Sequence, residues 1–341
     1  MNFSLLSTML LALALSSVSS FYVVHAQNSS FSALFAFGDS ILDTGNNNLL
    51  PTLSKCNFFP YGRNFIGGRP TGRFGNGRVF SDIIAEGLGI KPILPAYRDP
   101  SLSNNDLPTG VCFASGGSGL DDRTPRITAV LSIQDQLNDF KDYTAKLNGV
   151  VGSQANAVIS NAVFLISAGN NDLAIAFPTR MGQYTVFSYT DLLITYTQNL
   201  VKSLYDMGAR KFAIMGTLPL GCLPGATNTF GNVLKMCQVP ANQLATMFNQ
   251  KLSALVDNIG TQFAGAKFAY VDMYNPLLNI INNPMASGFI DARDGCCCTP
   301  TSIVPCLDAS RYVFWDIAHP TERSYLTIAP SIVADLKPKL A

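Results

Sequence analysis

The chain has 341 residues and a formal net charge of +1 at pH 7, from 23 Lys and Arg against 22 Asp and Glu. Because the charges balance and no basic run occurs, the composition argues against a nucleic-acid partner. After the N-terminal segment, no apolar run reaches the roughly 18 residues of a membrane-spanning helix, so we expect no transmembrane anchor.

Residues 1–26 have the pattern of a secretory signal peptide. The short apolar run LLSTMLLALAL is followed by Val24-His25-Ala26, which offers small residues at the usual cleavage positions. No Lys or Arg precedes the run, which is unusual for a signal peptide. A membrane anchor is the alternative, but the apolar run is short and serines interrupt the second half of the segment. We predict a secreted, extracellular protein that begins near Gln27. Asn28 then lies in the one N-glycosylation sequon of the remaining chain.

Short β-rich runs alternate with helical patterns along the rest of the chain. Runs such as VFLIS and KFAIM are continuously apolar, which is typical of parallel strands buried on both faces. We predict strands at residues 33–37, 111–114, 162–167, 211–215 and 267–272, and helices at residues 79–88, 127–147, 189–207 and 240–263. A last helix is expected to begin at Pro320, and Pro330 to kink or split it. The pattern predicts an α/β fold, a three-layer α/β/α sandwich with a five-stranded parallel sheet and right-handed crossovers.

Residues 27–341 contain no Pro- or Ser-rich linker and no internal repeat, so we predict one domain.

Three segments do not fit the alternation of strands and helices: residues 44–78, 217–239 and 282–315. Long irregular segments of a compact domain are usually functional loops or loops held by disulfides. Four arginines of the first segment could contact an anionic substrate, but solvated loop charges are the preferred interpretation. They are Arg63, Arg69, Arg73 and Arg78.

All eight cysteines follow the predicted cleavage point, and an even number in a secreted chain predicts disulfides. Cys222 and Cys237 would close a short loop, and one of Cys296, Cys297 and Cys298 could pair with Cys306. The connectivity stays open at this point. A zinc site at the cysteine triplet is the alternative, but the ligand spacing is wrong and no histidine is nearby.

Polar motifs follow the predicted strands at their carboxyl ends, where open parallel sheets bind ligands. Ser40 follows the first strand, and Ser115, Gly116 and Gly117 follow the second. Asn170, Asn171 and Asp172 follow the third, and Asp316 and His319 precede the last helix. Each motif alone is common turn chemistry, but together they converge on one edge of the sheet.

These residue types suit serine-based acyl transfer. A serine hydroxyl needs a base to take its proton, and once residues 1–26 are removed His319 is the one remaining histidine. Asp316, three residues earlier, can orient that imidazole, and the backbone N–H groups of Ser40 and Gly116 with the Asn171 amide can stabilise an oxyanion. The G-x-S-x-G elbow of α/β-hydrolases is absent.

The other polar candidates are interpreted as structural. Asp39 and Asp172 are expected to hold turn geometry, and Ser115 and Ser118 have no histidine to pair with. Cys112 is an improbable thiol nucleophile, because it falls in a strand pattern that should be buried.

Four sequence blocks resemble the signatures of the plant GDSL esterase/lipases, within the SGNH hydrolases: FAFGDSILDTGNNN, GVCFASGGSG, ISAGNNDLA and FWDIAHPTE. KCNFFPYGRNF, TGRFGNGR, GARKFAI, PLGCLP and GCCC also resemble the connecting pattern of that family, so the resemblance covers almost all of the chain after residue 26. Two departures are Cys112, where the family usually has Asn, and Cys298, where Gly commonly follows the Cys pair.

The resemblance implies a flavodoxin-like sheet, with Ser40 as nucleophile, Gly116 and Asn171 as oxyanion donors, and Asp316 with His319 completing the triad. It also implies hydrolysis of carboxylic esters such as acyl lipids without a metal or cofactor, by a protein of the cell wall or apoplast. An acyltransferase, an acetyl-polysaccharide esterase and a non-catalytic wall- or lipid-binding protein remain the alternatives, because loop shape sets the substrate.

Overall fold

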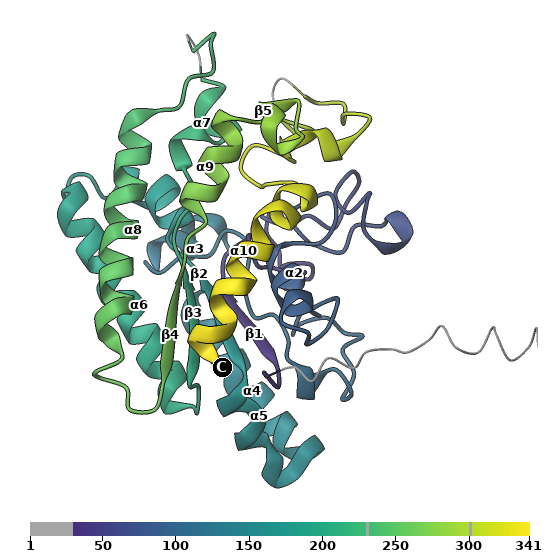
Figure 1. The fold of residues 1–341 in the computed structure, drawn as a ribbon, viewed down its shortest axis with the longest axis vertical. Helices are drawn as coiled ribbons and strands as arrows, with labels where there is room; N and C mark the ends of the chain where they lie inside the picture. The colour runs from purple at the N-terminus through teal and green to yellow at the C-terminus, as the bar shows by residue number, and fades with distance from the viewer. Residues whose placement is uncertain (1–29, 230–231, 300–301) are drawn as a thin grey trace, which may run out of the picture.

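The computed structural model describes residues 30–229, 232–299 and 302–341 (Figure 1). The predicted signal peptide at residues 1–26, with His25, and the Asn28 sequon lie outside the described residues.

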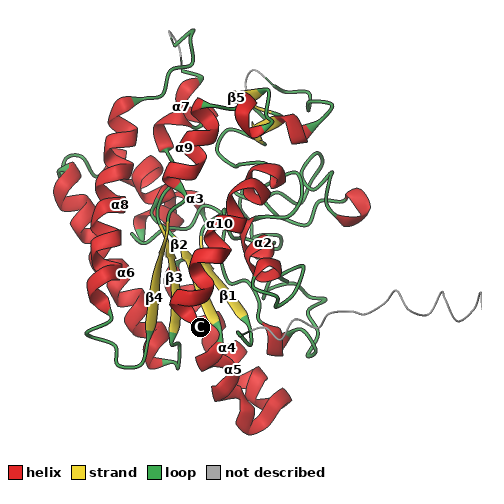
Figure 2. Cartoon of the chain, in the orientation of Figure 1, coloured by secondary structure: helices red, strands yellow, loops and turns green. Residues whose placement is uncertain are grey.

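A parallel four-stranded sheet lies at the centre of the fold, in the order β1-β2-β3-β4 (Figure 2). The strands are β1 (Leu34–Gly38), β2 (Val163–Ser167), β3 (Lys211–Met215) and β4 (Lys267–Val271). The register is unbroken across the sheet, so that Gly38 pairs with Ser167 and Ser167 with Met215. All residues of β1 and β2 are buried, as their continuously apolar sequences predict. The carboxyl ends of the strands are therefore level at one edge.

The predicted second strand at residues 111–114 is reduced to isolated parallel bridges from Cys112 to Ala36 of β1 and to Ala96. The Phe113 N–H donates to the Ala36 carbonyl at 2.8 Å, so this segment lies beside β1 as an edge of the sheet. With it included, the strand order is the flavodoxin-like one.

Helices cover both faces of the sheet (Figures 1 and 2). On one side α2 packs against α10, and on the other α4 contacts α6 and α6 packs against α8. The strand β4 is covered by α8 and by α10. The helices are α2 (Phe80–Gly87), α3 (Arg123–Thr128), α4 (Ile133–Val151), α5 (Ala155–Asn161), α6 (Val186–Asp206), α7 (Pro224–Thr227), α8 (Val239–Ile259), α9 (Tyr274–Asn282) and α10 (Glu322–Leu340), with a π-helical turn at Asp172–Ala176.

Two helix predictions need correction. The pattern at residues 127–147 is interrupted because Ala129 adopts a left-handed conformation after α3, and α4 starts only after Ser132, whose side chain accepts the Asp135 N–H. The last helix does not begin at Pro320, because Thr321 is its N-cap and accepts the N–H of Ser324. Pro330 does not split α10, whose buried face continues on both sides of the proline.

The segment at residues 282–315, predicted to be irregular, contains a second small sheet. Its strands are β5 (Asp291–Gly295) and β6 (Tyr312–Phe314), which pair in parallel. A disulfide between Cys296 and Cys306 closes the loop between them, which confirms the predicted pairing of the triplet with Cys306. The pairing of Cys222 with Cys237 is also confirmed.

Two features of the cysteines were not predicted. Cys297 and Cys298 are joined to each other, and this bond together with the Cys296–Cys306 disulfide leaves no thiolate in the triplet for zinc. Cys56 and Cys112 are both buried and free, so the even cysteine count does not mean that every cysteine is paired.

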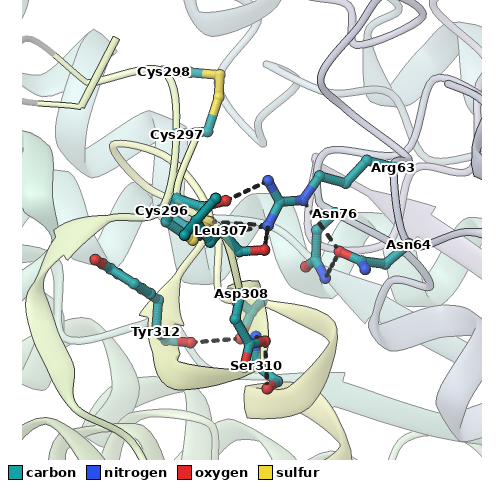
Figure 3. Close-up of a disulfide and its surroundings, with 12 residues drawn as sticks. Arg63, Asn64, Asn76, Cys296, Cys297, Cys298, Leu307, Asp308, Ser310 and Tyr312 are labelled. Carbon is teal, nitrogen blue, oxygen red and sulfur yellow. Dashed lines mark hydrogen bonds between the residues drawn. A yellow bond between two sulfur atoms is a disulfide. The ribbon is translucent and has the colours of Figure 1, made fainter. Parts of the chain in front are cut away.

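The interpretation of the loop arginines as solvated charges is wrong for three of them. Arg73 is buried in an ion pair with Asp82, and Arg78 pairs with Glu86 and Glu322. The Arg63 guanidinium donates to the Cys306 carbonyl at 2.6 Å. It also donates to the Leu307 carbonyl at 3.4 Å (Figure 3), and Arg69 is the one exposed arginine of the four. Glu322 and Cys306 lie 244 and 243 positions from their arginines, where loop composition gives no signal of them, whereas Asp82 and Glu86 belong to α2, directly after the loop.

Among the helices in the described parts of the chain, none combines the length and apolarity needed to cross a bilayer.

Candidate active site

Ser40 lies two residues beyond the end of β1. The turn that exposes it depends on Gly38, which has φ +117°, and a Cβ there would lie 1.7 Å from the Ser167 carbonyl oxygen of the neighbouring strand. The Asp39 N–H donates to that same carbonyl at 2.9 Å, so the chain leaves the sheet in one fixed direction.

Asp316 and His319 share a tight turn just before α10. The Trp315 N–H donates to the His319 carbonyl at 2.7 Å and closes this turn. One carboxylate oxygen of Asp316, Oδ1, accepts the backbone N–H groups of Ala318 at 2.9 Å and His319 at 2.8 Å. The turn therefore presents the imidazole and its carboxylate neighbour together.

The structure brings Ser40, His319 and Asp316 into one hydrogen-bonded chain. The Ser40 Oγ lies 2.8 Å from His319 Nε2, although the two residues are 279 positions apart. His319 Nδ1 lies 2.8 Å from both carboxylate oxygens of Asp316. The carboxylate is almost fully buried, and the imidazole is 13% exposed. A hydroxyl, an imidazole and a carboxylate hydrogen-bonded in this order are able to carry out serine acyl transfer.

Electrostatics favours a charged pair of Asp316 and His319. Burial raises the pKa of Asp316, but the charge and hydrogen bond of His319 and two backbone N–H groups hold that pKa below its usual value overall. Burial lowers the pKa of His319, but the charge and hydrogen bond of Asp316 and the charge of Asp39 raise it overall. The site thus stabilises an imidazolium.

The predicted backbone donor at Gly116 is engaged elsewhere. Its N–H donates to Asp43 Oδ2 at 2.8 Å, and Gly116 does not line the cavity at Ser40. The next residue, Gly117, lines that cavity with φ +89°, and within the described chain its N–H has no hydrogen-bond partner. Asn171 also lines the cavity, and one of its two amide N–H groups is free after the other donates to Ser118 O at 2.9 Å.

A cavity of about 280 Å³ opens beside Ser40 and His319. Apart from the polar groups near the serine, its wall is mainly apolar, and it includes Phe74, Ile175, Leu218, Leu220, Leu223 and Ile317. The Phe74 ring also contacts the His319 ring, with 5.2 Å between centroids. The site therefore joins a polar reaction centre to an apolar binding space.

The residues interpreted as structural have structural partners. Asp39 accepts from Ile41, Ser167 and Asn170, and Asp172 accepts from Leu120, Asp121 and Thr124. Burial raises the pKa of Asp172 to about 6. Ser115 donates to Asn47, and Ser118 accepts from Gln136. Cys112 is buried as expected, and its pKa is raised to about 12 by burial, so its thiol is not a nucleophile.

Sequence reasoning missed Tyr61, whose hydroxyl donates to Asp316 Oδ2 at 2.8 Å. The two residues are 255 positions apart, and Tyr61 lies in a loop that the alternation pattern left unassigned.

The geometry agrees with comparisons to known proteins. A model of the GDSL-like lipase/acylhydrolase family matches residues 34–332. The chain belongs to this family. Membership makes it a carboxylic ester hydrolase and accounts for the flavodoxin-like sheet.

Relatives from Arabidopsis thaliana match over nearly the whole chain. GDSL esterase/lipase At1g23500 is 71% identical over 347 aligned residues, covering 100% of both chains. GDSL esterase/lipase At1g73610 is 67% identical, covering 96% of this chain and 97% of its own. GDSL esterase/lipase EXL4 is 50% identical, covering 97% of this chain and 99% of its own.

Proposed function

We propose that the protein is a secreted serine hydrolase, folded as one domain over residues 27–341, that cleaves carboxylic esters through an acyl-enzyme. The observation that carries this proposal is the hydrogen-bonded chain from Ser40 through His319 to Asp316 beside an apolar cavity. Secretion is supported by the N-terminal sequence pattern, and the extracellular wall or apoplast is the expected location.

In the first step, His319 Nε2 takes the proton of Ser40 as the Oγ attacks the ester carbonyl. The tetrahedral intermediate collapses when the imidazolium returns that proton to the departing alcohol, and the acyl group remains on Ser40. Water then enters, loses a proton to His319 and releases the acid. Asp316 stays ionised and stabilises the imidazolium in both steps.

The oxyanion that forms in each step needs donors already in place. We assign these to the backbone N–H of Ser40, the backbone N–H of Gly117 and the free amide N–H of Asn171. Gly117 replaces Gly116 in this role because the Gly116 N–H already donates to Asp43. Asp43 thereby fixes the turn that presents Gly117.

The cavity wall supports an apolar acyl or alcohol group, as in acyl lipids, over an acetylated polysaccharide. An acyltransferase would use the same residues with an alcohol in place of water. A non-catalytic binding protein would not need the aligned serine, imidazole and carboxylate.

The test is hydrolysis of p-nitrophenyl esters from acetate to palmitate by the secreted protein, with Ser40→Ala beside it. Ser203→Ala is the matched control, because it removes a hydroxyl that donates to Asn199 on the surface of α6. We expect turnover that Ser40→Ala abolishes and Ser203→Ala retains. Activity that survives Ser40→Ala contradicts the proposal, and glycerol ester formed in preference to free acid when glycerol is added identifies an acyltransferase instead.

A further inference from the structure

We propose that Tyr61 is a positioning residue, which holds the Asp316 carboxylate and thereby tunes how strongly His319 takes up a proton. This inference rests on the proposed function, because it assigns Tyr61 a role through the base of that reaction. Tyr61 touches neither Ser40 nor the cavity, so it is not a catalytic residue itself.

The hydrogen bonds of Asp316 divide between its two oxygens. Oδ1 accepts the backbone N–H groups of Ala318 and His319, which come from the same turn. Oδ2 accepts the Tyr61 hydroxyl at 2.8 Å, and this donor comes from a distant loop. His319 Nδ1 lies 2.8 Å from both oxygens. Tyr61 therefore fixes the carboxylate from the side that the backbone N–H groups of its own turn do not reach.

Tyr61 reaches this place because its loop is docked onto the disulfide-closed segment before Asp316. Its ring meets the buried Trp315 ring edge-on, with 6.1 Å between centroids. Two residues on, the Arg63 guanidinium lies over the Trp315 ring at 5.2 Å and donates to the carbonyls of Cys306 at 2.6 Å and Leu307 at 3.4 Å. Figure 3 shows Arg63 reaching to the loop that the Cys296–Cys306 disulfide closes. The Tyr61 ring is thus held against Trp315, and Arg63 fastens the same loop to the other partner of that contact.

The charge on Asp316 makes Tyr61 a permanent donor. Burial raises the pKa of the phenol, and the negative charge of Asp316 raises it further, so the hydroxyl stays protonated through the working range of an esterase. Burial likewise raises the pKa of the other weak acids that face Asp316, Cys56 from the same loop and Tyr325 from α10. Asp39, directly after β1, is the second carboxyl group whose charge raises the pKa of His319. Of these groups, Tyr61 is the one whose side chain donates directly to Asp316.

A donor to the carboxylate competes with the imidazolium for its negative charge. Removing the Tyr61 hydroxyl leaves the negative charge of Asp316 less stabilised, so the carboxylate favours the protonated form of His319 more strongly. The pKa of His319 should then rise, and the enzyme should lose activity on the acid side at a higher pH than the wild type. A role in packing alone would lower stability and leave the pH profile in place.

The test compares Tyr61→Phe with Tyr143→Phe across pH. Tyr143 is fully buried, and its hydroxyl donates to the Leu107 carbonyl at 2.6 Å, so the control removes an equivalent hydroxyl elsewhere in the core. We expect Tyr61→Phe to lower kcat/KM about tenfold near neutral pH, the effect of losing one hydrogen bond to a charged group. Its acid-side midpoint should move to higher pH, whereas Tyr143→Phe should lower Tm without moving the midpoint.

An unmoved midpoint in Tyr61→Phe, or an equal shift in Tyr143→Phe, overturns the inference. Should Tyr61→Phe turn over too slowly, the titration of His319 by NMR decides, since the chain has only two histidines. A raised pKa for the imidazole supports the inference, and an unchanged one overturns it. Full activity in Ser40→Ala would refute the proposed function separately, because the NMR titration does not depend on turnover.

Discussion

Replacing Arg73 with methionine should destabilise the protein by about 3 kcal/mol, because it breaks a buried ion pair. Arg73 is 4% exposed and Asp82 is fully buried. The guanidinium donates twice to the carboxylate, from Nε to Oδ2 and from Nη2 to Oδ1, both at 2.8 Å. It also donates to the carbonyls of Thr44 at 3.2 Å and Leu94 at 2.9 Å. Methionine fills much of the same space but supplies none of these bonds.

The size of the expected loss in stability depends on the hydrogen bonds that Asp82 retains without Arg73. Losing one partner of a buried pair costs about 3–5 kcal/mol, because the remaining charge is left uncompensated. Asp82 still accepts the backbone N–H groups of Val79 at 3.0 Å and Leu94 at 2.9 Å, which places the expected cost at the lower end of that range. Replacing both residues, Arg73→Met with Asp82→Leu, removes the charge as well and should recover part of the lost free energy of unfolding, although the N–H groups of Val79 and Leu94 then lose their acceptor.

Urea unfolding at equal m-value measures these differences. Arg69→Met is the matched control, because Arg69 is the exposed arginine of the same loop and its loss should cost less than about 0.5 kcal/mol. If Arg73→Met costs no more than Arg69→Met, or if the double variant is no more stable than Arg73→Met alone, the pair does not behave as a buried one and the reasoning is refuted.

Two predictions concern the reaction itself. Asn171→Ala should lower kcat/KM about 10²-fold, equivalent to about 3 kcal/mol of transition-state stabilisation, and a loss below twofold in steady-state kinetics would remove Asn171 from the oxyanion site. The reaction needs a neutral His319, so kcat/KM should fall as pH drops through the pKa of that imidazole. Burial lowers this pKa, but Asp316 and Asp39 raise it above its usual value overall. The pH profile of Asp316→Asn should fall at lower pH than that of the wild type, and an unshifted or raised midpoint would contradict the assignment of Asp316.

Sequence alone was enough to bring Ser40 and Asn171 to one edge of the sheet, because topology decides where both lie. In a parallel sheet all strands end at one edge, so motifs that follow different strands must meet there whatever the loops do. The apolar runs of β1 to β4 carried this information, and the register that levels Gly38 with Ser167 and Met215 is its structural counterpart. The fold class and the approach of Ser40 to Asn171 therefore followed from pattern, whereas His319 follows β6 of the second sheet and its place rested on the sequence block that resembles the family signature.

The choice between Gly116 and Gly117 could not be made in the same way. Adjacent residues of a tight turn point their N–H groups in different directions, and the direction here is set by Asp43, whose carboxylate takes the Gly116 N–H at 2.8 Å. Asp43 lies 73 positions earlier, so no local pattern reveals it. Arg63 was misjudged and Tyr61 was missed for the same reason, since their partners Cys306 and Asp316 lie 243 and 255 positions away.

The segment at residues 44–78 holds the two halves of the active site together. Ser40 and His319 belong to opposite ends of the chain, so the loops between them must fix their relative position. Besides the bond from Tyr61 to Asp316, Arg78 Nε donates to Glu322 Oε1 at 2.7 Å, and Asn76 Oδ1 accepts the Glu322 N–H at 3.0 Å, in the first turn of α10. These contacts tie the start of α10, and the turn before it, to the loop that follows Ser40. Tyr61, Asn76 and Arg78 are therefore structural partners of the turn that carries His319, and substitutions among them should alter kcat through the placement of His319 without touching the substrate.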